Sequence, residues 1–236
     1  MRNIFHTISL QFVAVTASLA LVAGCAGSTP TIDTSPEAEV SFDGLHEVKG
    51  GKADEAWARP GIDLTQYSKI MLQGAGIEYR PGGNSGRSWS SRSRGGPYEV
   101  SERQKTKFRA LVVSVFLEEL SESKHFTLVD EAGPDVLLIR GAVLDVVSWA
   151  PPEPIGRGEV FISEVGEATL VLELRDSITE TVLVRAVDRR AAESYGLYGD
   201  LSLSSPVPNQ ADVKRVVRYW AQLLRERLDE FGAPKE

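Results

Sequence analysis

Cysteine and histidine are scarce in this sequence of 236 residues, which contains one cysteine and three histidines. A single cysteine cannot form a disulfide within the chain, and it excludes zinc or iron–sulfur sites built from several cysteines. The histidines include no HExxH motif, and His46 and His125 have no partner at the spacing of helical metal ligands. We therefore predict no metal site and no cofactor.

Clustered positive charge is missing from most of the chain. The 26 Lys and Arg residues are outnumbered by 33 Asp and Glu residues, which gives a formal net charge of -7. Because nucleic-acid binders neutralise phosphates with clustered positive charge, we expect no nucleic-acid partner. The hydrophobic content of 42% and charged content of 25% are ordinary for a globular domain. The length suggests one domain.

Catalytic patterns are equally weak. The nearest approach to a nucleophile elbow, Gly83-Asn84-Ser85-Gly86, lacks the second spaced glycine and lies in a predicted loop. Gly74-Ala75-Gly76 follows a predicted strand but does not continue as GxGxxG. No pair of acids is singled out for glycan hydrolysis. The sequence therefore does not predict an enzyme. A hydrolase of cell-wall or lipid material remains an alternative hypothesis, and only the expected location in the cell envelope supports it.

The N-terminus has the pattern of a secretory signal. One positive charge, on Arg2, precedes an apolar stretch from Ile4 to Val22 that suits a signal peptide better than a membrane span. The stretch ends in Val22-Ala23-Gly24-Cys25, which resembles the lipobox of bacterial lipoproteins. The resemblance implies cleavage before Cys25, a diacylglycerol on its sulfur and an acyl chain such as palmitate on its new amino group. The alternative is an ordinary signal peptide with a chance cysteine.

These features divide the chain into three parts. We predict a lipoprotein signal peptide over residues 1–24, a lipidated flexible tether over 25–43 and one globular domain over 44–236. The tether is rich in Ser, Thr, Pro and acids, which bury too little apolar area to offset ordering entropy. Ala26, in place of Asp, follows the cysteine, and by resemblance to enteric lipoproteins this implies sorting to the outer membrane, with the domain in the periplasm.

The globular part is predicted to be α+β. A helix is expected over 101–122, where Ser101 can cap and Gln104 completes a weak capping box, and an amphipathic helix over 210–231, capped by Asn209. The nearly continuous apolar run over 136–147 fits a central strand, or one carrying a bulge. Further strands are expected over 67–77, 126–129, 168–175 and 181–191.

This order favours a mostly antiparallel sheet of about five strands with the two helices packed on it. Because strict βαβ alternation is absent, a Rossmann-type nucleotide fold is not expected. Glu173, Arg175 and Asp176 are most simply a charge arrangement on the solvent face of the sheet.

Several landmarks together resemble one family. They are the lipobox cysteine, Gly44-Leu45, the segment Pro60-Gly61-Ile62-Asp63-Leu64-Thr65-Gln66-Tyr67, the strand end Glu173-Leu174-Arg175-Asp176-Ser177 and Trp220-Ala221 in the last helix. As a set they are similar to the bacterial lipoprotein family catalogued as domain of unknown function 3313. The resemblance covers nearly the whole mature domain and implies an envelope lipoprotein with a compact α+β domain. It supplies no reaction and no site residues.

The long loop over residues 80–97 is the most unusual segment. It is rich in Gly and Ser and contains four arginines and a tryptophan with no acid between them: Arg80, Arg87, Trp89, Arg92 and Arg94. Guanidinium groups bind phosphate in a bidentate manner, so these residues are candidates for binding anionic envelope polymers such as lipopolysaccharide, phospholipid or cell wall. The simpler interpretation is a mobile, solvated loop, because Gly/Ser-rich composition alone predicts flexibility.

The leading functional prediction is a non-catalytic accessory or binding domain, tethered to the membrane through its N-terminal lipid. Its expected partners are the membrane itself and an envelope protein complex. Binding of anionic polymers through the arginine loop is the alternative hypothesis.

Overall fold

The computed structural model describes residues 29–81, 97–150, 161–194, 202–203 and 206–232. Its two helices are α1, Glu102–Ser121, and α2, Pro206–Gly232. A small two-stranded sheet joins β7, Phe161–Ile162, to β10, Ser202–Leu203. The main sheet contains β1 (Thr31–Ile32), β2 (His46–Lys49), β3 (Glu55–Ala58), β4 (Lys69–Tyr79), β5 (Thr127–Leu128), β6 (Val136–Ser148), β8 (Glu164–Asp176) and β9 (Val182–Glu193).

The main sheet has eight strands in the order β1-β2-β3-β9-β8-β6-β4-β5. Pairing is antiparallel except that β4 runs parallel to both β6 and β5. The α+β class with a mixed, mostly antiparallel sheet and two helices is thus as predicted, whereas the expected count of about five strands is wrong. The additional strands contain only two to four residues each, too few for a periodic pattern to show.

One parallel crossover lies inside this fold. β4 leads into α1, and the chain then returns through β5 to β6, which pairs with β4 in parallel register from Lys69 opposite Val136 onward. A parallel neighbour requires a crossover connection, and α1 supplies it. The expected bulge is also present in β6, because the pairing with β8 shifts between Leu144 and Val147.

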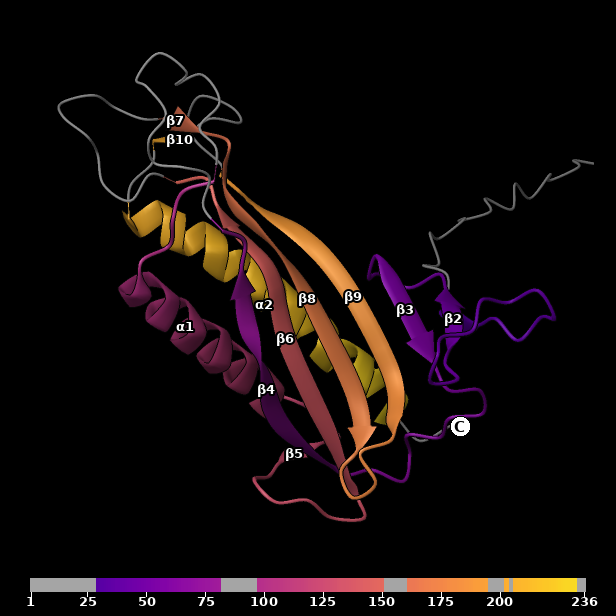
Figure 1. Ribbon diagram of the computed structural model, residues 1–236. Helices are drawn as coiled ribbons and strands as arrows, with labels where there is room; N and C mark the ends of the chain where they lie inside the picture. Colours follow the sequence, from indigo (N-terminus) through magenta and orange to yellow (C-terminus); the bar gives the residue numbers. More distant parts are fainter. Residues whose placement is uncertain (1–28, 82–96, 151–160, 195–201, 204–205, 233–236) are drawn as a thin grey trace, which may run out of the picture.

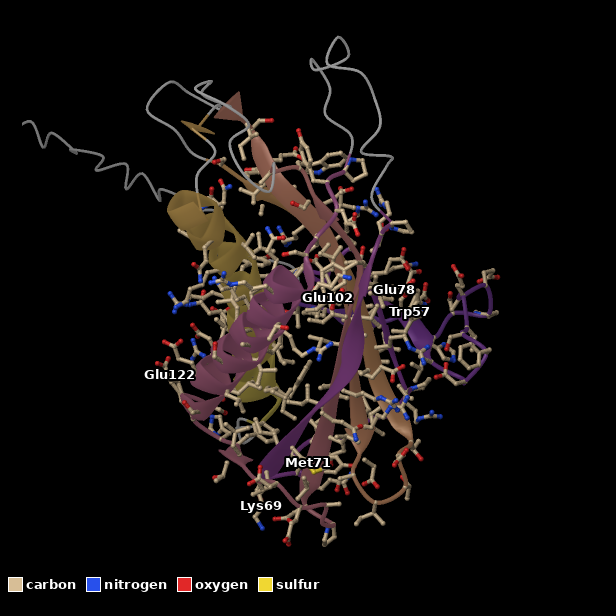
Figure 2. All side chains as sticks on the ribbon, turned by 60° about the vertical axis from the view of Figure 1, so that its left-hand side comes forward. Trp57, Lys69, Met71, Glu78, Glu102 and Glu122 are labelled. Carbon is tan, nitrogen blue, oxygen red and sulfur yellow. The ribbon has the colours of Figure 1, made fainter. Side chains whose placement is uncertain are left out.

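Both helices lie on one face of the sheet, which we call the inner face (Figure 1). In Figure 2 they lie to the left of the long strands, with Glu102 and Glu122 at the two ends of α1. The core forms where they meet the long strands, and its most completely buried side chains include Ile70, Val115, Leu120, Leu137, Ile139 and Leu228. Alternation along the strands therefore gives one apolar face under the helices and one face that carries charge.

The helix ends are close to expectation at α1 and shifted at α2. The capping box of α1 is confirmed, because Ser101 N donates to Gln104 Oε1 at 2.9 Å and Gln104 N donates to Ser101 Oγ at 3.4 Å. α2 begins at Pro206, so Asn209 lies inside the helix and is not its cap. Proline suits a first helical position because its fixed φ is helical and its missing N–H needs no partner there.

The described part of the segment expected to be a flexible tether, residues 29–43, contacts the edge of the main sheet. Ile32 of β1 pairs with Val48 of β2, and Lys49 Nζ lies 2.5 Å from Asp33 Oδ2. Asp43 Oδ2 lies 2.7 Å from Arg185 Nη2 on β9. These contacts build the segment into the sheet edge, and composition alone did not reveal them. Among the described helices, none is long and apolar enough to cross a membrane.

Candidate functional site

The main sheet is wider than the helix layer that covers it. α2 packs against β8 and β9, while β3 and β2 continue the sheet beyond β9 (Figure 1). On the inner face, Ala56 of β3 stands opposite Ala186 of β9, and Ala58 opposite Val184. These small side chains leave space between the sheet edge and α2. The result is a cavity that no helix fills.

The cavity has a volume of about 430 Å³ and is open on one side. This size lies within the range of about 300–1,000 Å³ that is typical of small-molecule sites. Its floor is the inner face of β8, β9 and β3, and its remaining walls come from α2, from the segment after Pro60 and from the start of the described chain. The main apolar lining residues are Pro30, Ile32, Val48, Ile62, Leu64, Leu170, Leu172, Leu174, Leu223, Leu224 and Phe231.

Asp188 is the buried member among the polar residues that line the cavity, with 4% of its surface exposed. Its Oδ2 accepts hydrogen bonds from Trp220 Nε1 and from Arg190 Nε, each at 2.7 Å. The Arg190 guanidinium lies over the Tyr219 ring, 4.1 Å from its centroid, and also donates to the Tyr219 hydroxyl at 3.1 Å. This carboxylate therefore holds α2 on β9 rather than presenting a free charge to the cavity.

The other polar residues lie at the mouth and carry both signs. Lys52 Nζ is 3.8 Å from Glu226 Oε2, and Arg227 Nη1 is 2.5 Å from Glu230 Oε2. Among the residues that the structure describes, no group of three His, Cys, Asp or Glu side chains is placed to hold a metal. The arrangement is suited to holding an apolar group inside and a polar group outside.

A second cluster lies on the opposite, outer face of the sheet and contains Arg80 from the predicted anion-binding set. Its guanidinium pairs with Asp145 and lies 3.5 Å from Glu167 Oε1. Arg189 contacts the same two acids, at 3.1 and 2.7 Å. Asp145 has a φ of 54° at the β6 bulge, and the hydrogen bond from Arg80 lowers the pKa of its carboxyl. Arg80 is therefore engaged within the fold.

The other predicted site residues, Cys25, Arg87, Trp89, Arg92 and Arg94, lie outside the described residues and stay predictions. The charge arrangement on the solvent face is confirmed for Glu173, which accepts hydrogen bonds from Arg175 and Arg185, both at 2.9 Å. Asp176 is placed differently. It accepts a hydrogen bond from the Tyr67 hydroxyl at 2.9 Å and from backbone groups of the β8–β9 turn.

Sequence reasoning missed the cavity, because it predicted no strand over the residues that form β3. One signal was present. In Glu55-Ala56-Trp57-Ala58, small and large residues alternate, which is the period of a strand with one uncrowded face. Trp57 pairs with Arg185 on the outer face, so the two alanines are left on the inner face.

The model of DUF3313, described as a protein of unknown function, matches residues 36–224. No curated protein matches the chain. Among solved structures, a PelC dodecamer from Paraburkholderia phytofirmans is 10% identical, with a TM-score of 0.34 over 72% of this chain and 95% of that one. Protein XCC0632 from Xanthomonas campestris is 13% identical, with a TM-score of 0.39 over 74% of this chain and 90% of that one. Similarities of this size carry no information about function.

Proposed function

The chain belongs to the DUF3313 family, and we propose that it is a membrane-anchored envelope lipoprotein whose domain binds a ligand or partner rather than catalysing a reaction. The anchor is the lipid on Cys25. The destination is the outer membrane, with the domain in the periplasm.

The observation that carries the proposal is the position of the cavity relative to the predicted anchor. Pro30 and Ile32 line the cavity, and Pro30 follows Cys25 by five residues. An extended chain spans at most about 3.6 Å per residue, so five residues reach about 18 Å. A lipidated Cys25 would therefore hold the open cavity close to the membrane surface.

The chemistry of the cavity supports binding. Its walls are apolar, and its buried acid, Asp188, already accepts hydrogen bonds from Trp220 and Arg190. A general acid or base must reach its substrate with a free proton or lone pair, and an acid engaged by Trp220 and Arg190 suits a structural role better. Binding of anionic polymers through the loop at 80–97 has less support, because Arg80 pairs with Asp145 and Glu167.

The test is in-cell crosslinking of the affinity-tagged full chain, with Cys25→Ser as the unlipidated comparison. We expect a diacylglycerol-modified Cys25 on the intact chain, membrane fractionation that Cys25→Ser abolishes, and a defined set of partners captured by the anchored form. An unmodified Cys25 on a chain that is released from the membrane would overturn the proposal. Retention of glycan or lipopolysaccharide that charge reversal at Arg87, Arg92 and Arg94 removes would favour the anionic-polymer alternative instead.

A further inference from the structure

We propose that the cavity between β3, β9 and α2 binds one long acyl chain. The proposal deepens the binding function above and rests on it for the source of the chain, because an envelope lipoprotein is surrounded by acyl chains. The cavity itself does not depend on the anchor.

The walls of the cavity are lined by large apolar side chains. Leu170, Leu172 and Leu174 of β8 form a row along the floor, and Ile32, Val48 and Leu223 close the sides. Several of these large apolar side chains, among them Ile32, Val48, Leu172 and Leu223, are only partly buried, because the cavity exposes them. An apolar ligand would remove this surface from water, which is the main driving force for binding in such sites.

The buried polar lining residue Asp188 is already engaged by the protein. Its Oδ2 accepts hydrogen bonds from Trp220 and Arg190, its Oδ1 accepts a weaker one from Arg190 at 3.5 Å, and the carboxylate offers a ligand no donor. A polar group placed there would lose its hydrogen bonds to water without replacement. The ligand must therefore be apolar along its whole inserted length, and its polar end must stay at the mouth.

The mouth of the cavity carries charges of both signs. Lys52 lies near Glu226 and Arg227 near Glu230, so opposite charges alternate and no single sign dominates. Such a rim does not select a particular head group. What the site recognises is the chain, and a volume of about 430 Å³ fits one chain better than a whole two-chain lipid with its head group.

Two sources of the chain are within reach. One is the lipid on Cys25 of the same molecule, and Pro30 at the cavity wall is the fifth residue after that cysteine. The other is a lipid of the bilayer to which the protein is anchored. The chemistry is shared, and the experiment separates the sources.

The experiment is photocrosslinking in living bacteria that express the tagged full chain and are fed palmitate bearing a diazirine near its methyl end. Light converts the diazirine to a carbene, which inserts into the nearest C–H bonds, and peptide mapping locates the adducts. We expect adducts on peptides that contain Leu172 or Leu223. With the intact chain, an adduct joined to the Cys25 peptide identifies the protein's own lipid. Adducts that persist in Cys25→Ser identify a bilayer lipid.

A matched pair of variants tests the cavity. Ala56→Phe places a ring into the space, and Glu55→Phe places the same ring one residue earlier on the opposite face of β3. We expect Ala56→Phe to reduce labelling of the cavity peptides at least about tenfold, and Glu55→Phe to change it by less than about twofold. Leu223→Trp, which fills the space from α2, replaces Ala56→Phe if that variant fails to fold.

Labelling that is absent from cavity peptides while Cys25 carries the probe would overturn the acyl-chain proposal and leave the anchored binding function standing. Equal labelling in Ala56→Phe and Glu55→Phe would overturn it as well. Labelling of the cavity without any lipid on Cys25 would support the acyl-chain site and contradict the anchor. The two proposals can therefore fail separately.

Discussion

Charged side chains find their partners differently on the two faces of the main sheet. On the inner face, the buried carboxylate of Asp188 is matched by donors from Trp220 and Arg190, surrounded by apolar packing. On the outer face, Glu173 and Arg185 form part of a chain of half-buried ion pairs that crosses the strands. The inner face depends on a few buried contacts that water cannot replace. The outer face depends on many ion pairs whose groups water could solvate instead.

This difference predicts how strongly each face should respond to substitution. Removing one partner of a buried pair leaves the other charged or polar group unsatisfied in a low-dielectric site, whereas an exposed ion pair contributes little.

The largest effect is expected for Asp188→Ala. The substitution leaves the buried Trp220 N–H without an acceptor and removes the carboxylate that pairs with Arg190, and the free energy of unfolding should fall by about 4 kcal/mol. Urea denaturation followed by circular dichroism measures it. Trp220→Phe should lower the free energy of unfolding less in the Asp188→Ala variant than in the wild-type protein, because the two residues share one hydrogen bond. Additive losses would show that Asp188 does not hold Trp220.

The next effect is expected for Ile139→Ala in β6. Ile139 is fully buried on the inner face, and its truncation should lower the free energy of unfolding by about 3 kcal/mol through lost burial and a residual cavity. Gln73→Ala is the control, since Gln73 is exposed on the neighbouring strand opposite Arg140. It should change stability by less than about 0.5 kcal/mol. Similar losses in both variants would contradict the assignment of the two faces.

The outer face should give the protein its sensitivity to acid. The hydrogen bond from Arg185 lowers the pKa of Asp43, and although burial raises the pKa of Glu173, hydrogen bonds from Arg175 and Arg185 outweigh it and lower that pKa too. A carboxyl whose pKa is lower in the folded state stabilises the protein above its unfolded pKa of about 4. This stabilisation is lost as the pH falls through the folded pKa.

We therefore expect stability to decline below about pH 4 and Asp43→Asn to flatten that decline. At pH 7 the substitution should lower the free energy of unfolding by about 1 kcal/mol, since it weakens two hydrogen bonds from Arg185. Denaturation curves at pH 7, 5 and 3 measure both effects. If the stability of Asp43→Asn fell as steeply between pH 5 and pH 3 as that of the wild-type protein, groups other than Asp43 would cause the acid sensitivity.

The smallest effect is expected for Arg80→Ala. Its contacts with Asp145 and Glu167 lie at the solvent-exposed end of the outer face, with 36% of the Arg80 side chain exposed. Exposed pairs contribute about 0–1 kcal/mol, and Arg189 continues to contact both acids. Thermal unfolding at low and high salt is the measurement. A loss above about 2 kcal/mol would show that the cluster at the β6 bulge is a structural centre.

The long elements of the fold were predictable because their patterns are long. The eleven or more residues of β4, β6, β8 and β9 show alternation or continuous apolarity, and Ser101 with Gln104 marks the start of α1. The parallel pairing of β4 with β6 was not predictable from these patterns. α1 and β5 lie between β4 and β6 along the chain, and a helical connection allows a parallel neighbour, but the patterns do not show which strand becomes that neighbour.

The cavity could not be predicted from the sequence, and the reason is physical. A cavity is defined by side chains that are too small, such as Ala56 and Ala186, and their pairing across β3 and β9 depends on contacts more than a hundred residues apart. Asp188 has the same character. Alternation from Val184 and Ala186 places it on the inner face, but its local sequence does not show its buried partner, Trp220 of α2.

β1 is an edge strand of the main sheet, and this position has a mechanical consequence. β1 pairs with β2 through two residues only, and β2 pairs with β3 through two more. Tension applied at the N-terminus would load these short ladders before it reached the long pairing of β9 with β8. The edge strands would detach in sequence, and the first residues to leave, Pro30 and Ile32, belong to the wall of the cavity. Pulling on this end of the chain would therefore open the cavity while the rest of the sheet stayed intact.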